Sequence, residues 1–472
     1  MNHLKNSALV IIWPALITTI LTAADWAAAD WTRFRGPNGT GVSPDIGLPK
    51  EIDLGKNLAW SIKAPPGNSS PIVVDGRLYL TAHEGDRRLV LCFDAATGKQ
   101  LWRKSLIKMH AESFNPLNGP TTPTPTSDGD RLFVFFPDIG LLAFDRDGKE
   151  LWRTSLGPFA SIQGIAVSPV YVEGNVVLLI DTPDEAYLAS FAAATGLQVW
   201  KVQRPTNILG SYTTPTLYMR DGEETQIVVA GAEELTGYRA STGERVWWAR
   251  GVTTAPAAPP FILGDSVYTV EEGGNPWPPF PLDRFDKNHN GIIEASEYGN
   301  DPVWARQLIS IDKKLGNGDK DVSEEEYRKA TQVIGGGLIR TRLGGKGDVS
   351  ESHVVWRHLK GTGTLAGPLL YQNILYLIRN GIVSTFDPES GKMLRQERVK
   401  NALGEYYASP VAADGKVYLI SLDGKVTVLK AGADWRILSS GDLGEQAIAT
   451  PAIAGGCIYF RTAGTLFCFG SR

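Results

Sequence analysis

The stretch LCFDAATGKQLW (residues 91–102) decides the fold, because related segments recur along the chain. In each segment a β-like run ends in a turn with glycine, and a tryptophan follows four residues later. Glycine suits the positive-φ position of a tight turn. A tryptophan at a fixed offset can bury its large ring against the neighbouring unit. The copies are LAFDRDGKELW (142–152), ASFAAATGLQVW (189–200) and GYRASTGERVW (237–247), with the pairs Gly98/Trp102, Gly148/Trp152, Gly196/Trp200 and Gly243/Trp247.

A second motif, a small residue followed by proline, opens each unit. The successive prolines are 54, 44, 46, 44, 109, 42 and 41 residues apart. Apart from the gap of 109, these spacings are near the length of a four-stranded propeller blade, about 40–45 residues. The motif occurs at Ser70-Pro71, Thr124-Pro125, Ser168-Pro169, Thr214-Pro215, Ala258-Pro259, Gly367-Pro368, Ser409-Pro410 and Thr450-Pro451.

The count of outer strands predicts how the ring closes. Eight opening motifs are followed by seven outer strands, because the last unit, ATPAIAGGCIYFRTAGTLFCFGSR, has chain for three strands only. The missing strand is expected around Trp60, in NLAWSIKAP, so that no ring edge stays open. We therefore predict an all-β, eight-bladed β-propeller over residues 58–472, closed by an N-terminal strand. The outer strands are marked by Trp102, Trp152, Trp200, Trp247, Trp356, Leu394 and Trp435.

Composition is that of an ordinary globular protein. The chain has 472 residues, 47 Lys+Arg against 51 Asp+Glu, and a net charge of −4, so we expect no nucleic-acid partner. The cysteines Cys92, Cys457 and Cys468 form no CxxC motif, which argues against c-type haem and a cysteine-ligated zinc site. We expect buried free thiols, with a bridge from Cys457 to Cys468 as the alternative.

Residues 1–29 have the pattern of a secretory signal peptide. Lys5 precedes an apolar run from Ala8 to Leu21, and Ala27-Ala28-Ala29 supplies small residues for cleavage. The run is shorter than the roughly 18 residues of a membrane span, although an uncleaved anchor is the alternative. We expect an exported protein, periplasmic or extracellular, with no membrane span in the mature chain. A lead-in, residues 30–57, follows, and its segment WTRFRGPNGTG (31–41) is expected to pack over the ring.

The 109-residue gap contains an insertion, placed at residues 276–336 in blade five. DKNHNGIIEASE (286–297) matches the twelve-residue EF-hand loop. Carboxylate, amide and backbone oxygens at alternating positions suit calcium, and Gly291 allows the sharp turn. An acidic turn without metal is the alternative. The expected ligands are Asp286, Asn288, Asn290, the carbonyl of Ile292, Glu294 through water, and Glu297.

A second, degenerate loop follows at the spacing of a paired EF-hand. LGNGDKDVSEEE (315–326) has Leu315 and Lys320 at positions that suit calcium poorly. Asp312 lies three residues too early and is a candidate substitute through a longer loop. Flanking helices are expected over 301–309 and 323–334. The candidate ligands here are Asn317, Asp319, Asp321 and Glu326, with Ser323 at the intervening position.

The FDAATGKxLW-type segments resemble the repeat of PQQ-binding-like β-propellers, a family that includes quinoprotein alcohol dehydrogenases and the BamB outer-membrane assembly factor. The resemblance covers residues 58–470 outside the insertion, and it is specific for the fold rather than for function. It implies a quinone in the central funnel for the dehydrogenases, which also place a vicinal disulfide against it. This chain has no adjacent cysteines, and no cysteine near the cleavage site that could carry the lipid of BamB.

Catalytic signatures are absent from the sequence: it has no GxSxG, Walker A or HExxH motif. His110 lies in a long loop at the rim, where a solvated role is expected. Arg204 is a candidate anion ligand at the rim without a supporting second residue. Asp94, Asp145 and Asp387 recur at one repeat position, so we interpret them as hydrogen-bonding the turn backbone.

Two function classes follow. The first is a calcium-binding module that binds or assembles a protein or small-molecule ligand at the rim face, with no catalytic residues. The second is a quinoprotein-like oxidoreductase with PQQ in the funnel, which predicts a tryptophan-lined funnel and a calcium site of Asp, Asn and Glu inside the ring. We favour the first and do not expect PQQ. The pattern leaves the natural ligand and the oligomeric state open.

Overall fold

The structure is a computed structural model that describes most of residues 30–470. The predicted signal peptide, residues 1–29, lies outside the described residues, as does most of the predicted helix 301–309. Within the described part, none of the helices has the length and hydrophobicity needed to cross a membrane. The undescribed internal residues are 112–113, 116, 160, 162, 183–184, 206–209, 232–233, 252–255, 272–281, 299–304, 306–307, 310–311, 313–316, 332–336, 359–363 and 401–403.

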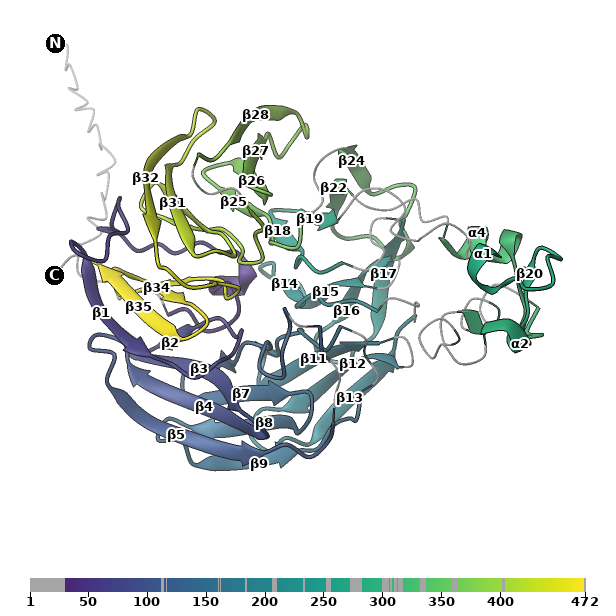
Figure 1. The fold of residues 1–472 in the computed structure, drawn as a ribbon, viewed down its shortest axis with the longest axis horizontal. Coiled ribbons are helices and arrows are strands. Elements are labelled where there is room, and N and C mark those ends of the chain that lie inside the picture. Colours follow the sequence, from purple (N-terminus) through teal and green to yellow (C-terminus); the bar gives the residue numbers. More distant parts are fainter. Residues whose placement is uncertain are drawn as a thin grey trace, which may run out of the picture.

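The described strands form nine sheets, of which eight are the blades around a central axis and one is a two-stranded sheet in the insertion (Figure 1). Each blade is an antiparallel meander that runs from a short inner strand to an outer strand at the rim. Blades one to four are β2 (Ile72–Val74), β3 (Arg77–Glu84), β4 (Arg87–Asp94) and β5 (Gln100–Ile107); β6 (Thr126–Ser127), β7 (Arg131–Phe136), β8 (Gly140–Asp145) and β9 (Glu150–Thr154); β10 (Val170–Val172), β11 (Asn175–Asp181), β12 (Ala186–Ala192) and β13 (Gln198–Gln203); β14 (Thr216–Tyr218), β15 (Gln226–Gly231), β16 (Glu234–Arg239) and β17 (Arg245–Arg250).

The remaining blades follow in the same way. Blade five is interrupted by the insertion, and blade eight combines strands from both ends of the chain. Blades five to eight are β18 (Phe261–Leu263), β19 (Ser266–Glu271), β22 (Gly337–Arg342) and β24 (Val354–His358); β25 (Leu369–Tyr371), β26 (Ile374–Arg379), β27 (Ile382–Phe386) and β28 (Met393–Arg398); β29 (Val411–Ala413), β30 (Lys416–Ile420), β31 (Lys425–Lys430) and β32 (Arg436–Asp442); β33 (Ala452–Ala454), β34 (Cys457–Arg461), β35 (Thr465–Gly470) and β1 (Leu58–Lys63).

The predicted closure is confirmed. β1 pairs antiparallel with β35, with Trp60 opposite Cys468, and supplies the outer strand of blade eight. The second and third strands of the blades are continuous apolar runs, such as Asn175–Asp181, because neighbouring blades cover both of their faces. The outer strand β5 alternates between exposed and half-buried side chains, as expected at the rim.

The repeated tryptophans bind each blade to the next. Each indole lies over the turn glycine of the following blade, where a Cβ would overlap the ring; for Gly148 the nearest ring atom would be 2.7 Å away. The indole N–H also donates to a backbone carbonyl of that turn, at 2.8 to 3.2 Å. The predicted burial of these tryptophans is therefore confirmed. The pairs are Trp60/Gly98, Trp102/Gly148, Trp152/Gly196, Trp200/Gly243 and Trp356/Gly391.

Trp247 is an exception among the repeat tryptophans. It is fully buried and donates to the side-chain oxygen of Gln226 in its own blade, at 2.8 Å. A short strand from blade five, β23 (Gly347–Asp348), pairs in parallel with β17 and places Gly347 opposite Trp247. Blades four and five are therefore joined by strand addition instead of by a tryptophan docked on a glycine.

The repeated Ser/Thr-Pro motif forms a hydrogen-bonded ring around the axis. The backbone N–H of one motif donates to the hydroxyl of the next at 2.9 to 3.1 Å. Ala258 and Gly367 have no hydroxyl, so the ring is interrupted at blades five and six. The bonds run from Ser70 to Thr124, Thr124 to Ser168, Ser168 to Thr214, Gly367 to Ser409, Ser409 to Thr450 and Thr450 to Ser70.

The lead-in segment 31–42 threads the ring instead of packing over it, so this prediction was wrong. Trp31 forms a β-bridge with Val73 in blade one, and Val42 forms one with Ala412 in blade seven. Between them, Asn38 in η1 (Pro37–Gly39) exchanges hydrogen bonds with Leu217 in blade four. Segment 31–42 therefore contacts inner strands on opposite sides of the axis, and we call it the plug.

The insertion forms a small lobe beyond the rim (Figure 1). It joins β19 to β22, the second and third strands of blade five. In an antiparallel meander this connection leaves on the same face as the connections between blades, which we call the connection face. The lobe buries Phe285, Ile293, Tyr298, Leu308, Val322 and Tyr327, and it contains α1 (Leu282–Phe285), β20 (Ile292–Ile293), α2 (Ala295–Tyr298), β21 (Val322–Ser323) and α4 (Glu324–Thr331).

Candidate functional site

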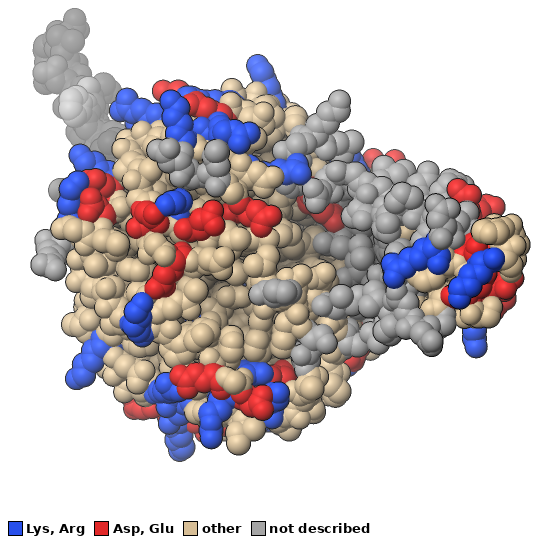
Figure 2. Space-filling view, in the orientation of Figure 1, with Lys and Arg blue, Asp and Glu red and all other residues tan. Residues whose placement is uncertain are grey.

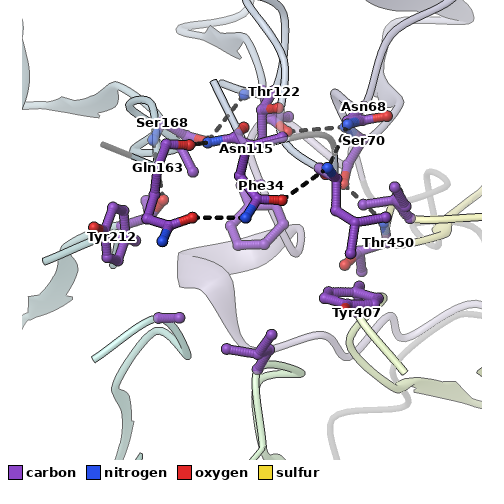
Figure 3. Close-up of a pocket in the computed structure, with 18 residues that line it drawn as sticks. Phe34, Asn68, Ser70, Asn115, Thr122, Gln163, Ser168, Tyr212, Tyr407 and Thr450 are labelled. Atoms are coloured by element: carbon purple, nitrogen blue, oxygen red, sulfur yellow. Dashed lines mark hydrogen bonds between the residues drawn. The ribbon is translucent and has the colours of Figure 1, made fainter. Parts of the chain in front are cut away.

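A pocket of about 510 Å³ opens on the propeller axis. Its walls come from the connections between blades, and Phe34 of the plug contributes the inner end (Figure 3). Phe34 also lines the narrow gap around Arg33 and Arg35, and neither of these buried arginines lines the pocket. The volume is within the usual range for small-molecule sites, about 300–1,000 Å³.

Carboxamides hold one side of the pocket together. The side-chain nitrogen of Asn115 donates to Oε1 of Gln163 at 2.8 Å, and that of Asn118 donates to the backbone carbonyl of Gln163 at 2.7 Å. Asn68 donates to the carbonyl of Leu117 at 3.2 Å (Figure 3). These bonds join three successive connections and fix the orientation of the amides before a ligand arrives.

The described residues that line the pocket are uncharged. They include no Asp, Glu, Lys, Arg or His side chain, and no tryptophan. Figure 2 shows Lys, Arg, Asp and Glu side chains at the rim and on the inserted lobe, together with a row of acidic side chains across the upper half of the ring. His110, which the sequence singled out, does not line the pocket and donates its backbone N–H to Asp138.

Two arginines of the plug, Arg33 and Arg35, are buried inside the ring and do not line the pocket. Arg33 donates from Nη2 to the carbonyl of Pro215, and Arg35 donates from Nη2 to that of Pro368. Their Nε and Nη1 atoms are buried without a hydrogen-bond partner in the described structure. Burial lowers the pKa of Arg33 to about 10 and that of Arg35 to about 9. The plug therefore places two cationic groups inside the ring, near Ala258-Pro259 and Gly367-Pro368.

Arg204 is not an anion ligand at the rim, so that prediction was wrong. Its guanidinium is fully buried and pairs with Asp181 at 3.1 Å. Ser211 also donates to this carboxylate at 2.6 Å, while Arg204 donates to the hydroxyl of Tyr238 at 2.5 Å. The network connects blade three to blade four, so Arg204 has a structural role.

The repeated aspartates act on their turns as predicted. Oδ1 of Asp94 accepts the backbone N–H and the hydroxyl of Thr97, at 2.8 and 2.7 Å. Asp387 does the same with Ser390, and these bonds lower its pKa. The three cysteines are free thiols as predicted, but only Cys92 and Cys468 are buried, and Cys457 is half-buried.

The first inserted loop is closed by its two terminal carboxylates. Asp286, which is buried, accepts the N–H groups of Asn290 and Gly291 at 3.1 and 2.9 Å. Gly291 has a φ of 82°, which the sharp turn requires. Glu297 accepts from the N–H groups of Glu294 and Lys287, which lowers its pKa.

Three of the expected ligands in this loop, Asn288, Asn290 and Glu294, also bond to each other. The amide oxygen of Asn288 accepts the N–H of Asn290, and the amide nitrogen of Asn290 donates to Glu294 at 2.9 Å. Ile292 pairs with Ser323 across the β20–β21 ladder. Within the described residues, no three His, Cys, Asp or Glu side chains converge as a metal cluster. The donors are carboxylate, amide and carbonyl oxygens, which suit Ca²⁺ rather than a softer metal.

The second loop uses Asp312 where its twelve-residue register has Leu315. Asp312 is buried and accepts the N–H groups of Gly318 and Lys320, each at 2.7 Å. Lys320 adopts a φ of 77°, as Gly291 does in the first loop. Asp312 thus accepts the N–H of Lys320, at the sixth position of its loop, as Asp286 accepts that of Gly291 in the first loop.

The other predicted residues of the second loop serve local contacts. Asn317 accepts the N–H of Asp319, and Asp319 accepts that of Asp321. Asp321 reaches across to the N–H of Ala295 at 2.9 Å, which ties the two loops together. Glu326 accepts from the N–H and hydroxyl of Ser323, both at 2.8 Å.

The structure defines an eight-bladed β-propeller with a plugged axis and a pocket on one face. Residues 86–276 match a family described as outer membrane protein assembly factor BamB. The outer membrane protein assembly factor BamB of Bordetella pertussis is 25% identical over 298 residues, which cover 61% of this chain and 66% of that protein. The chain thus spans just under two thirds of this relative.

Solved structures agree on the fold. BamB from Moraxella catarrhalis superposes with a TM-score of 0.54 at 12% identity, covering 88% of this chain and 97% of that one. A europium-containing methanol dehydrogenase superposes with a TM-score of 0.59 at 11% identity, covering 94% and 98%. At such low identities the likeness shows the propeller architecture alone.

Proposed function

We propose that this chain is an exported, calcium-binding β-propeller that acts as a binding or assembly module. Its ligand binds on the connection face, and calcium holds the inserted lobe in shape. The observation that carries the proposal is the uncharged pocket on the axis, whose described walls offer amides and aromatic rings but no acid, base or nucleophile with a catalytic partner. The similarity to BamB proteins supports the same class of function.

Calcium would be held in the first loop by Asp286, Asn288, Asn290, the carbonyl of Ile292, Glu294 through water, and Glu297. In the second loop Asp312 would join Asn317, Asp319, Asp321 and Glu326. The hydrogen bonds that now close each loop would be shared with or replaced by the cation. Because β20 and β21 pair the two loops, binding in one would order the other.

Titration calorimetry with Ca²⁺ tests the metal site. We expect weak binding, about 10⁻⁴–10⁻³ M as in extracellular EF-hand modules, and loss of most of the heat in Glu297→Gln. Glu173→Gln, at an exposed turn of blade three, is the matched control and should bind as the wild type does. Unchanged calcium binding in Glu297→Gln would contradict the assignment.

A photo-crosslinking amino acid tests the binding face in the native host compartment. Placed at Leu365, which lines the pocket and is 54% exposed, it should give a discrete adduct. Placed at Glu173, at a turn between first and second strands on the opposite face, it should give none. Equal labelling from both positions, or none from Leu365, would count against the proposal.

The alternative is a quinoprotein-like oxidoreductase, a class of function found on the same propeller architecture, as in the europium-containing methanol dehydrogenase. PQQ is a tricarboxylate quinone, which calls for cations and a stacking ring. The described lining has aromatic rings in Phe34, Tyr212 and Tyr407, but it supplies no cation and no tryptophan, and neither Arg33 nor Arg35 lines the pocket. The residues present therefore do not fit the quinone. Saturable quenching of tryptophan fluorescence by added PQQ would reverse this conclusion.

A further inference from the structure

We propose that the axial pocket binds a neutral, hydroxyl-rich ligand, the terminal sugar of a carbohydrate. The inference rests on the proposed function and specifies the ligand class for the same pocket. It follows from four properties of the described walls: their charge, their hydrogen-bonding groups, their aromatic rings and their closed inner end.

The charge of the pocket excludes ionic ligands. A buried carboxylate or phosphate needs a paired cation, since burying a charge without one is costly. The described lining has no cation. Arg33 and Arg35 do not line the pocket, and their Nη2 atoms already donate to backbone carbonyls of the ring, so the described walls offer a ligand no cation to pair with.

The hydrogen-bonding groups suit hydroxyls. Gln163 uses its Oε1 for Asn115, and its Nε2 has no partner within the described structure. Asn68 donates from Nδ2 to Leu117, which leaves Oδ1 as a free acceptor there. A sugar hydroxyl both donates and accepts, so adjacent hydroxyls can satisfy a free amide donor and a free amide acceptor together.

Two tyrosines supply apolar faces for the C–H groups of a sugar ring. Tyr212 and Tyr407 line the pocket from two different connections (Figure 3). Burial raises the pKa of Tyr212 to about 12, so its phenol stays neutral. Aromatic rings bordered by amides are a lining of the kind that binds compact ligands with one apolar and one polar side.

The shape of the pocket favours a chain end over an extended segment. Phe34 lines the inner end, and the other described lining residues lie in the connections between blades, so we infer that a ligand enters from the connection face along the axis. An extended peptide would instead need a groove open at two ends for its backbone hydrogen bonds. A single terminal ring, with the next residue leaving toward solvent, matches this geometry.

Calorimetry and saturation-transfer NMR with glucose, maltose, cellobiose and N,N′-diacetylchitobiose test the proposal on the full-length mature protein. At least one sugar should bind saturably, and Gln163→Ala and Tyr212→Ala should each weaken it about tenfold, which corresponds to about 1.4 kcal/mol. Gln100→Ala, on the exposed outer strand of blade one, is the matched control and should change nothing.

Citrate and an end-blocked tripeptide serve as charged and peptidic probes. Failure of all four sugars to saturate, equal sugar binding by Gln163→Ala, or competitive binding of citrate or the peptide would overturn the carbohydrate assignment. Tyr212→Phe, which keeps the ring, should retain binding even if Tyr212→Ala proves unstable. The Leu365 crosslink reports separately on the proposed function: an adduct without sugar binding would leave that function standing and remove this inference.

Discussion

Arg35 occupies the space that a side chain at Gly367 would need. A Cβ on Gly367 would overlap Nη1 of Arg35 and would come within 3.0 Å of Oγ of Ser409. The same guanidinium donates to the carbonyl of Pro368, the next residue. Blade six therefore lacks the hydroxyl of its opening motif because the plug takes its place.

Introducing the repeat's hydroxyl residue at position 367 should destabilise the protein. Gly367→Ser would give blade six the small hydroxyl residue found in most other blades, yet we expect it to lower the free energy of unfolding by about 1–3 kcal/mol through overpacking. Denaturant unfolding measures this. Combining it with Arg35→Ala should cost less than the sum of the two single changes, and strict additivity would show that the two residues do not compete for space.

The tryptophan docking can be separated from turn strain. Gly243 and Gly76 have φ values of 73° and 71°, but a Cβ at Gly243 would lie 2.6 Å from Trp200, whereas nothing lies within 4 Å of one at Gly76. Alanine at Gly76 should cost about 1–2 kcal/mol from the left-handed backbone. Alanine at Gly243 should cost about 1–3 kcal/mol more, measured as a difference in chemical unfolding. Equal costs would refute a packing role for Trp200.

The closing strand should make stability depend on acidic pH. Burial alone would raise the pKa of Glu445, but Thr462, Lys63, Thr465 and the N–H of Gly464 lower it to about 2. A depressed carboxylate pKa stabilises the fold above the ordinary value of about 4.5 and loses that contribution as pH falls toward 2.

Thermal unfolding at pH 2 to 6 checks this linkage. Glu445→Gln should be less stable than the wild type at pH 6 and should approach it as the pH falls to 2. Glu173→Gln, at an exposed turn, should follow the wild-type curve throughout. A constant difference between wild type and Glu445→Gln across this range would be incompatible with the linkage.

Removing only one partner of the buried ion pair between Arg204 and Asp181 should lower the free energy of unfolding. Arg204→Met leaves Asp181 charged and unpaired in the interior, so we expect a loss of about 3–5 kcal/mol. Adding Asp181→Leu removes the orphaned charge and should recover part of that loss. A double-mutant cycle by urea unfolding measures the coupling, which should be near zero only if Arg204 were a solvated rim residue.

Local repetition explains what the sequence predicts well. The Gly/Trp spacing requires one docking geometry in every blade, so it predicts the blades, and the surplus strand at Trp60 predicts the closure. The recurring Asp94 position likewise predicts its turn contacts. Sites that form only when residues from several blades come together cannot be predicted in this way. The pocket draws single residues from several connections, none of which carries a motif.

The errors have the same origin. The polar composition of WTRFRGPNGTG suggests a segment exposed on the surface. In the structure, however, its two arginines donate hydrogen bonds to backbone carbonyls inside the ring. Arg204 resembles a rim residue in the sequence because its partner, Asp181, lies in a different segment of the chain and pairs with it only in the folded protein. The second inserted loop is not such an error, because the sequence already offers Asp312 as a substitute for Leu315, and Asp312 accepts the N–H groups of this loop in the structure.

The pairing of β1 with β35 has a consequence for biosynthesis. β1 is translated long before its partner β35, and the long intervening chain makes their encounter entropically slow. Until β1 and β35 pair, both strands expose backbone N–H and C=O groups without partners, which can pair with another nascent copy of the chain. A chaperone that shields Leu58–Lys63 during synthesis would therefore raise the yield of monomeric rings more than one acting on any central blade.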